Sequence, residues 1–234
     1  MNQERLWRDD KMSNTSKGRG EKGSKFWMQL LVNTKLVEEL NSAIDKNIRW
    51  LSPLKNQDDY AEYELTQSYI SDITKIPKAV FGFWPSRQPQ WDAIAINEEK
   101  KILYLVEAKA HLKEFESSSK AKSNESQKQI DVAMKGVFDK YYPKGDYTKW
   151  HAPYYQLGNR LTFIYKLNEL LEENNWKAKL ILLNIADDFT YKPTAVEDWK
   201  KHYEIVFADM LGIRKSPADV ELIYYSVQMK GTCV

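Results

Sequence analysis

The stretch QWDAIAINEEKKILYLVEAKA, residues 90–110, determines the expected fold. It contains two strand-like runs, 90–97 and 102–110, which are separated by the polar segment Glu-Glu-Lys-Lys at 98–101. Runs of apolar and β-branched residues joined by a short polar segment are typical of a β-hairpin. The sequence therefore predicts that these two runs pair antiparallel and that the other elements assemble around them.

Three charged residues interrupt the apolar character of this predicted hairpin. Glu107 and Lys109 lie two positions apart in the second run, so they project from the same face. If the turn is centred between residues 99 and 100, Asp92 lies directly opposite Glu107, with about 5 Å between the two Cβ atoms. A slip of one residue would turn Asp92 to the other face. This register predicts that two carboxylates and one ammonium meet at one end of the hairpin.

Two carboxylates at this separation raise each other's pKa unless a cation lies between them. Mg²⁺ binds one or two carboxylates together with water and phosphate oxygens, and a bound metal can orient a water, lower its pKa and clamp a phosphate. Lys109 would add positive charge beside the attacking water or the phosphate. The pattern favours metal-dependent hydrolysis of phosphodiesters, and its alternative is a structural ion network at the end of a sheet.

The segments on either side of the hairpin predict a mixed α/β domain. Apolar periodicity predicts helices at 26–46, from Asp58 or Asp59 to Thr74, at 125–141, at 153–174 and at 194–211 before Gly212. Strand-like runs lie at 47–54, 78–84, 178–186 and 220–228. Residues 1–25 are polar and are expected to form a flexible tail, so that residues 26–234 form a single domain.

Composition limits the class of protein. A length of 234 residues suits one domain, and 42% hydrophobic with 29% charged residues indicates a globular chain. The net charge of +2 gives no sign of nucleic-acid binding by itself. The single cysteine, Cys233, excludes a disulfide framework and a cysteine-based zinc site. No apolar run approaches the roughly 20 residues that span a bilayer, so we expect a cytoplasmic protein with no membrane contact.

Four motifs together resemble the PD-(D/E)xK superfamily of restriction-endonuclease-like nucleases, and within it a family of uncharacterised bacterial proteins. They are WLSPL (50–54), FWPSRQPQWDA (83–93), LVEAKAH (105–111) and YYQLGNRL (154–161). The resemblance as a whole extends over about residues 45–230. The chain departs from the family pattern in one respect, because Trp91 rather than proline precedes Asp92.

The resemblance implies a restriction-endonuclease-like core, which is a mixed central β-sheet flanked by α-helices, and a Mg²⁺-dependent nuclease site in which Mn²⁺ is expected to substitute. It implies that Asp92, Glu107 and the backbone carbonyl of Ala108 bind the metal. Lys109 would be the catalytic lysine. The expected partner is nucleic acid, DNA rather than RNA, and a homodimer is an open expectation because many such enzymes pair to cut two strands.

Many members of the superfamily add a metal-binding glutamate from the first helix of the core. The candidates here are Glu62 and Glu64, which lie in the predicted helix that precedes the hairpin. Glu62 is the favoured one, and its alternative is an ordinary solvated charge on a helix. The sequence thus predicts a catalytic and metal-binding set that Glu62 completes.

Four further residues are candidates for substrate binding. His111 follows Lys109 by two positions, although an ordinary strand-end histidine is the alternative. Gln156 and Arg160 lie four apart on a predicted helix, with Asn159 beside them, and resemble a glutamine-containing helix motif of some superfamily members. Arg160 could bind a phosphate through two hydrogen bonds. The alternative is a buried polar network that ties this helix to the sheet.

Two functions remain open from the sequence. The first is a metal-dependent nuclease. The alternative is a catalytically inactive nucleic-acid-binding or protein-interaction module on the same fold. Trp84 and Trp91 flank the predicted site and could stack on a base, although core packing is the better interpretation for Trp91.

Overall fold

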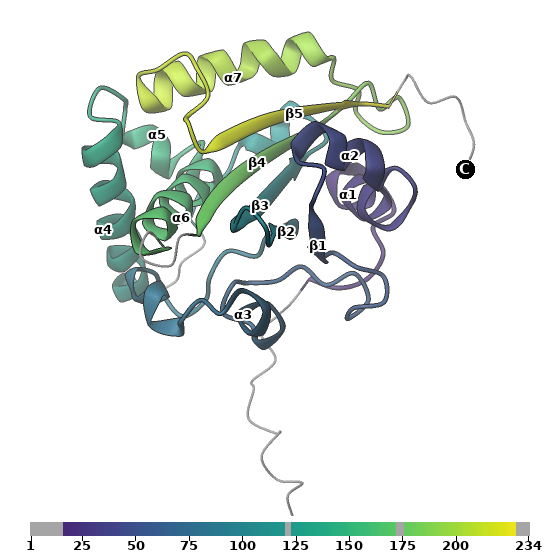
Figure 1. The fold of residues 1–234 in the computed structure, drawn as a ribbon. Coiled ribbons are helices and arrows are strands. Elements are labelled where there is room, and N and C mark those ends of the chain that lie inside the picture. Colours follow the sequence, from purple (N-terminus) through teal and green to yellow (C-terminus); the bar gives the residue numbers. More distant parts are fainter. Residues whose placement is uncertain (1–15, 120–122, 172–175, 228–234) are drawn as a thin grey trace, which may run out of the picture.

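A five-stranded sheet whose strand order follows the chain, β1-β2-β3-β4-β5, forms the centre of the protein (Figure 1). β1, β2 and β3 are antiparallel to one another in turn, whereas β4 and β5 continue parallel to β3. The strands are β1 (Arg49–Ser52), β2 (Ala93–Asn97), β3 (Ile102–Lys109), β4 (Lys177–Ala186) and β5 (Val220–Ser226). The computed structural model describes residues 16–119, 123–171 and 176–227.

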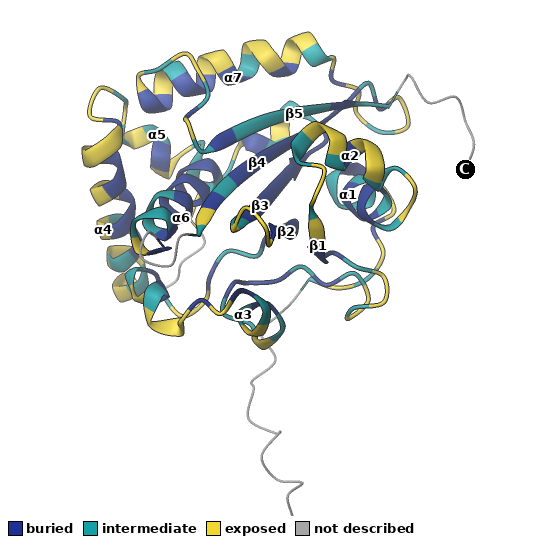
Figure 2. Ribbon diagram, viewed as in Figure 1, coloured by how far each residue is buried: buried dark blue, intermediate teal, exposed yellow. Residues whose placement is uncertain are grey.

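Helices cover both faces of this sheet, and the exposed residues gather on their outward sides (Figure 2). One face packs against α4 (Asn124–Tyr141), α5 (Thr148–His151), α6 (Tyr155–Leu171) and α7 (Val196–Leu211). The other packs against α1 (Gly23–Asn33) and α2 (Val37–Ile44). No helix among these described residues is long and apolar enough to cross a membrane. The predicted α/β class, a mixed sheet flanked by helices, is confirmed.

Alternation along the strands sorts their side chains between two hydrophobic cores. In β3, Leu103 and Leu105 face the core under α4, α6 and α7, whereas Tyr104 and Val106 face the core under α1 and α2. This is the period-two pattern of a sheet that is covered on both faces. β4 lies between β3 and β5 and is apolar toward both cores, as expected for the run at 178–186. Because side chains alternate, Glu107 and Lys109 project toward α6.

The helix predicted between Asp58 or Asp59 and Thr74 is wrong over most of its length. Only α3 (Ser68–Thr74) is helical there. The residues at 58–60 have φ values of 51°, 52° and 60°, in the left-handed region that side chains seldom adopt. Tyr63 then forms an isolated antiparallel bridge with Trp91. The segment that carries Glu62 is therefore extended and runs beside the residue that precedes Asp92.

Other boundaries also differ from the prediction. The helix predicted at 26–46 is two helices, α1 and α2, separated by an extended residue at Thr34. The strand predicted at 78–84 is a short 3₁₀ helix, η1 (Lys78–Phe83), and a second one, η2 (Leu112–Phe115), follows β3. The helix predicted at 153–174 begins at Tyr155. Gly212 ends α7 with a φ of +67°, as expected of a helix C-cap.

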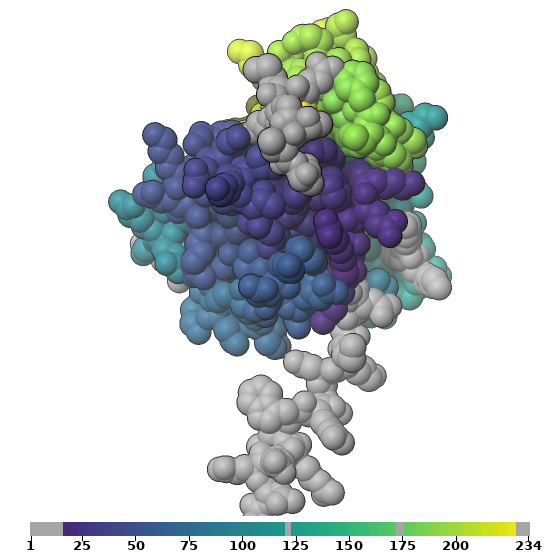
Figure 3. Space-filling model, turned by 90° about the vertical axis from the view of Figure 1, so that its right-hand side faces the viewer, coloured from purple at the N-terminus to yellow at the C-terminus, as the bar shows by residue number. Residues whose placement is uncertain are grey.

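The N-terminal boundary predicted at residue 25 lies too far along the chain. Residues 1–15 are outside the described residues, but α1 begins at Gly23. Before it, Ser16 O accepts a hydrogen bond from the Glu62 backbone at 2.9 Å, and the Gly20 backbone donates to Gln29 Oε1 at 2.8 Å. The N-terminal segment lies against the segment that follows β1, visible in Figure 3 as purple beside blue. Residues 16–25 thus belong to the folded unit.

Candidate active site at the open end of the hairpin

The β2–β3 hairpin has the register expected from its turn. Ala93 pairs with Val106 and Ile94 with Leu105, so the next position of the same register faces Asp92 toward Glu107. Asp92 itself lies one residue before β2. Its Oδ2 accepts a hydrogen bond of 2.7 Å from the Ala108 backbone N–H. β3 continues beyond the end of β2, and there the Asp92 side chain accepts the hydrogen bond that a backbone carbonyl of a neighbouring strand would otherwise accept.

Glu107 is 3% exposed and has a cationic partner on each of its two oxygens. Lys109 Nζ donates to Oε1, and Arg160 Nε donates to Oε2 at 2.7 Å. Burial raises the pKa of Glu107, but the positive charges of Lys109 and Arg160 outweigh it, so the net result is a lowered pKa. Glu107 is held as a carboxylate.

Lys109 is buried and is held by two elements at once. Besides its bond to Glu107, Lys109 Nζ donates to Gln156 Oε1 on α6 at 2.7 Å. The Gln156 backbone N–H in turn donates to Ser117 Oγ at 2.8 Å. The ammonium is thereby fixed between β3 and the first turn of α6, on the face where Glu107 projects. The structure brings Gln156 together with the predicted catalytic lysine.

Arg160 ties α6 to the segment that precedes β2. Its Nη2 donates to the Gln90 carbonyl at 2.8 Å and its Nη1 to Asn159 Oδ1 at 3.1 Å. Its guanidinium carbon also lies 4.5 Å from the centre of the Trp91 ring, a cation–π distance. Arg160 and Asn159 therefore form the buried polar network that the sequence left as an alternative, and Trp91 is a core residue within it.

Asp92 is the least stabilised carboxylate of the site. Burial raises the pKa of Asp92 well above its ordinary range, the nearby charge of Glu107 raises it further, and Lys109 only partly offsets these effects. The two acids thus differ in state, because Glu107 has the two cations and Asp92 has a single backbone donor. A buried acid whose charge lacks compensation is a mark of functional sites, although ion networks also produce it.

Glu62 approaches the site from the extended segment rather than from a helix. Burial raises the pKa of Glu62, Lys25 and a hydrogen bond from Ser16 lower it, and the charge of Glu107 raises it again. The prediction that Glu62 and Glu64 lie on a helix is therefore wrong for both residues. Among the described residues, no three His, Cys, Asp or Glu side chains are grouped so that they could hold a metal ion. The role of Glu62 as a metal ligand stays a prediction.

His111 follows β3 and contacts Glu114 and Tyr191. Its Nε2 lies 3.3 Å from Glu114 Oε1, and its ring centre lies 5.6 Å from that of Tyr191. Burial lowers the pKa of His111, and the charge of Glu114 partly opposes this effect. The role of His111 in substrate binding stays a prediction.

The groups around Asp92 suit a hard divalent cation in kind. The N–H and C=O of one strand residue point to the same side, so the Ala108 carbonyl faces the side where its N–H meets Asp92. Two carboxylates and a carbonyl are the oxygen ligands that Mg²⁺ accepts, with water completing its shell. To bind the ion, Glu107 would have to give up its hydrogen bond with Lys109 or with Arg160, so that one of its oxygens becomes available. On that condition the residues fit a Mg²⁺ ion.

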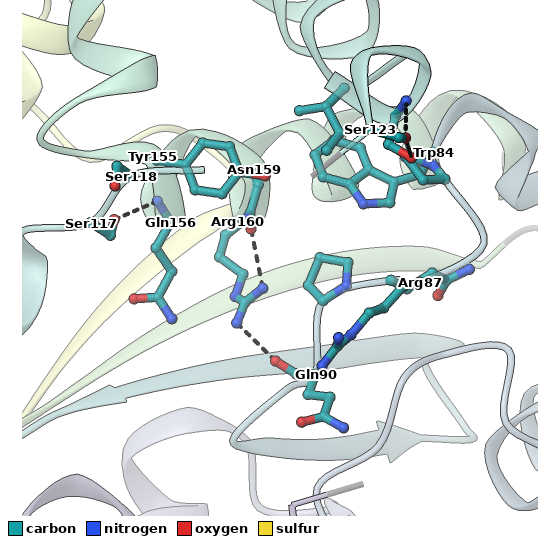
Figure 4. Close-up of a pocket in the computed structure, with 15 residues that line it drawn as sticks. Trp84, Arg87, Gln90, Ser117, Ser118, Ser123, Tyr155, Gln156, Asn159 and Arg160 are labelled. Atoms are coloured by element: carbon teal, nitrogen blue, oxygen red, sulfur yellow. Dashed lines mark hydrogen bonds between the residues drawn. The ribbon is translucent and has the colours of Figure 1, made fainter. Parts of the chain in front are cut away.

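A cavity of about 870 Å³ adjoins these groups. It lies between the segment before β2, the first turn of α6 and the serines that lead into α4 (Figure 4). Gln156 and Arg160 line this cavity and also a small space around Glu107 and Lys109. The cavity is therefore adjacent to the acid site, because it shares Gln156 and Arg160 with the small space that Glu107 and Lys109 line.

Sequence reasoning missed several residues of this region. Arg87, Gln88 and Gln90 line the cavity, and they lie in the FWPSRQPQWDA motif, of which only Asp92 and the two tryptophans were singled out from the sequence. The signal was thus present in the density of polar residues before the strand. Lys25 approaches Glu62 from the segment expected to be a tail, and its sequence context carried no signal.

Comparisons of the chain with protein-family models, with curated proteins and with solved structures found no match.

Proposed function

We propose that this chain is a Mg²⁺-dependent nuclease that hydrolyses phosphodiester bonds, in DNA more readily than in RNA. The observation that carries the proposal is the meeting of Asp92, Glu107 and Lys109 at the open end of the β2–β3 hairpin. A fully satisfied ion network would leave each acid with its charge compensated. Here Asp92 is half-buried beside Glu107, and desolvation together with the charge of Glu107 raises its pKa, a state that a divalent cation would relieve.

The topology supports a restriction-endonuclease-like core as part of this proposal. The acids lie on an antiparallel hairpin, β2–β3, and the strands that follow it run parallel to β3. α6 then brings Gln156 and Arg160 to the same end of the sheet. A mixed sheet flanked by helices is the core that the resemblance of the four motifs implies, so fold and motifs favour the same family.

Each residue has a distinct role in the proposed reaction. Asp92, Glu107 and the Ala108 carbonyl would hold the ion, which supplies a Lewis acid and a water of lowered pKa when it is bound. Lys109, held by Gln156, would donate to the attacking water or to the phosphate oxygen on which charge develops. Arg160 is a positioning residue. It donates to Glu107 through Nε, while its other donors bind the Gln90 carbonyl and Asn159.

One observation favours a second function, a catalytically inactive nucleic-acid-binding or protein-interaction module. Both oxygens of Glu107 already have cationic partners. A closed network of this kind can be purely structural, since buried ion pairs also specify how elements meet. The two functions differ in what happens when a divalent metal is supplied.

A cleavage assay distinguishes the two functions. Plasmid DNA, single-stranded DNA and RNA are incubated with the purified chain and Mg²⁺, Mn²⁺ or a chelator. The nuclease cuts with either metal and stops with the chelator, and Lys109→Ala removes cutting. Lys100→Ala is the matched control, because Lys100 belongs to a Glu-x-Lys pattern at the exposed turn of the same hairpin. Binding without cutting at any metal concentration would establish the inactive module instead.

A further inference from the structure

We propose that the cavity beside the acid site binds an unpaired segment of the nucleic acid, so that the protein acts on single-stranded DNA or on frayed ends rather than on intact duplex. The inference rests on the proposed nuclease function and specifies the substrate of that site. It stands on the position, size, charge and hydrogen-bonding groups of the cavity.

The position of the cavity connects it to the reacting groups. Gln156 and Arg160 line it, and the same two side chains hold Lys109 and Glu107. In Figure 4 both side chains descend from α6 toward Gln90, on the opposite wall. A strand that lay in the cavity would therefore contact the two side chains that hold Lys109 and Glu107, one side chain away from the acid site.

The size of the cavity suits unpaired nucleotides. Its volume of about 870 Å³ lies within the range of roughly 300–1,000 Å³ that is typical of small-molecule and cofactor pockets. A duplex keeps its bases stacked inside the helix, and proteins that need a base within a pocket must take it out of that stack. An unpaired strand presents its bases without that expense, so single-stranded nucleotides are the occupants that fit.

The charge of the cavity suits a phosphate backbone. Among the described residues that line it are two arginines, Arg87 and Arg160, and no Asp or Glu. Arg160 is already held by Glu107, whereas Arg87 is exposed at the rim. The N-terminal ends of α4 and α6 also border the cavity, and helix N-termini favour anions. Phosphates along the rim would therefore meet positive potential.

The hydrogen-bonding groups of the cavity suit bases. Gln88 is 5% exposed, and its Oε1 has no hydrogen-bond partner among the described residues. A buried acceptor of this kind needs an explanation, and a base amino group would supply the missing donor. The half-buried ring of Tyr155 lines the same cavity and can stack on a base, as aromatic residues do in single-strand-binding sites. Amides and an aromatic ring together recognise unpaired bases.

A binding assay in the presence of chelator tests this inference without cleavage. Fluorescence anisotropy compares a labelled single strand of about 20 nucleotides, longer than the roughly 4–16 nucleotides of one single-strand-binding site, with a duplex closed by loops at both ends. The single strand is expected to bind about tenfold more tightly. Tyr155→Leu should weaken single-strand binding by about tenfold, the effect of losing one stacked base. Arg87→Gln should weaken it and lower the salt slope by about 1.

Lys200→Gln on α7 is the control for surface charge, because Lys200 pairs with Glu197 away from the cavity. Arg87 is exposed, so Arg87→Gln tests the cavity even if Tyr155→Leu fails to fold. Equal affinity for the closed duplex and the single strand, or wild-type affinity of Arg87→Gln, would overturn the inference. Plasmid cleavage without single-strand preference would then leave the nuclease proposal standing. Single-strand binding through the cavity without cleavage in any metal would reject the nuclease and keep the cavity assignment.

Discussion

The β2–β3 hairpin carries acids and lysines at both of its ends, and the two ends treat them in opposite ways. At the turn, Glu98 and Lys100 are exposed and pair with Arg49 and Asp45. At the open end, Glu107 and Lys109 follow the same Glu-x-Lys spacing but are buried among α6 residues. The same Glu-x-Lys spacing thus lies in a solvated turn at one end and in a candidate active site at the other. The difference between the two ends is the burial of the charged side chains.

The aspartates at the two ends make the contrast sharper. Although burial works against it, hydrogen bonds from Lys100, Tyr104, Asn47 and Asn97 lower the pKa of Asp45 to about 2. The pKa of Asp92, which has a backbone donor and an acidic neighbour, is raised well above its ordinary range. Asp45 is a satisfied structural carboxylate. Asp92 is held in a state that weakens the folded protein, which is the expected sign of a residue retained for chemistry.

The largest effect is expected from Glu107→Gln. The change leaves Lys109 and Arg160 buried without their carboxylate, and removing one partner of a buried ion pair is worth about 3–5 kcal/mol of unfolding free energy. Urea unfolding measures this loss, and the cleavage assay should show no activity. Glu221→Gln, which breaks the half-exposed pair with Lys179, is the matched control and should lose far less. Equal losses for both changes would show that burial gives the Glu107 pairs no greater contribution to stability than a half-exposed pair.

A kinetic effect of intermediate size is expected from Gln156→Leu. Gln156 is the only α6 acceptor found for Lys109 Nζ within the described part of the chain, so its loss leaves the ammonium positioned by Glu107 alone. Residues that orient a catalytic group are typically worth about 10–100-fold in activity. Initial rates of cleavage give the value. Gln129→Leu on α4, which removes an exposed hydrogen bond from Gln129 to the Gly82 carbonyl of η1, should keep the wild-type rate, and a similar fall in both would show a general effect of α-helix disruption.

The hairpin and its register could be predicted from the sequence because both rest on local rules. A period-two pattern and a short polar turn left Asp92 opposite Glu107 in the favoured register, and the observed pairing of Ala93 with Val106 agrees with it. The spacing of Gln156 and Arg160 on one helix likewise needs only helical periodicity. These features depend on residues that are close in the sequence.

The features that could not be predicted depend on contacts between distant segments. Glu62 was assigned to a helix because its neighbours are apolar at helical spacing, whereas left-handed residues at 58–60 and the Tyr63–Trp91 bridge make the segment extended. The ordered segment at 16–22 is held by backbone bonds to residues about 40 positions away, as in the Ser16–Glu62 pair. The cavity likewise has walls from three separate parts of the chain, so no local pattern marks it.

A smaller effect, with opposite signs at the two ends, is expected from replacing each aspartate. Asp92→Asn should raise the unfolding free energy at neutral pH by about 1–2 kcal/mol, because a folded pKa above the unfolded value means that charging Asp92 weakens the fold. Asp45→Asn should lower it by about 1–2 kcal/mol, since Asp45 stabilises the fold as a carboxylate. Urea unfolding in chelator at pH 7 measures both changes.

The pH dependence of stability in the same two variants tests the sign of each change in unfolding free energy independently. The advantage of Asp92→Asn should grow as the pH rises above the ordinary aspartate value of 3.8, since wild type loses stability while the folded pKa is approached. The disadvantage of Asp45→Asn should be complete above 3.8 and vanish as the pH falls through about 2. Two curves of the same sign would contradict the contrast between the aspartates.

The smallest effect is expected from Glu98→Gln, at the turn. Glu98 and Arg49 have side chains that are 66% and 49% exposed, and exposed pairs contribute less than about 1 kcal/mol. The unfolding free energy should therefore change by no more than about 0.5 kcal/mol, and the cleavage rate should not change at all. Glu98 lies two residues before a lysine, as Glu107 does. A comparison of the two variants therefore separates the effect of burial from the effect of the Glu-x-Lys spacing. A loss of cleavage comparable to that of Glu107→Gln would place the chemistry at the turn and remove the reason for assigning it to the open end.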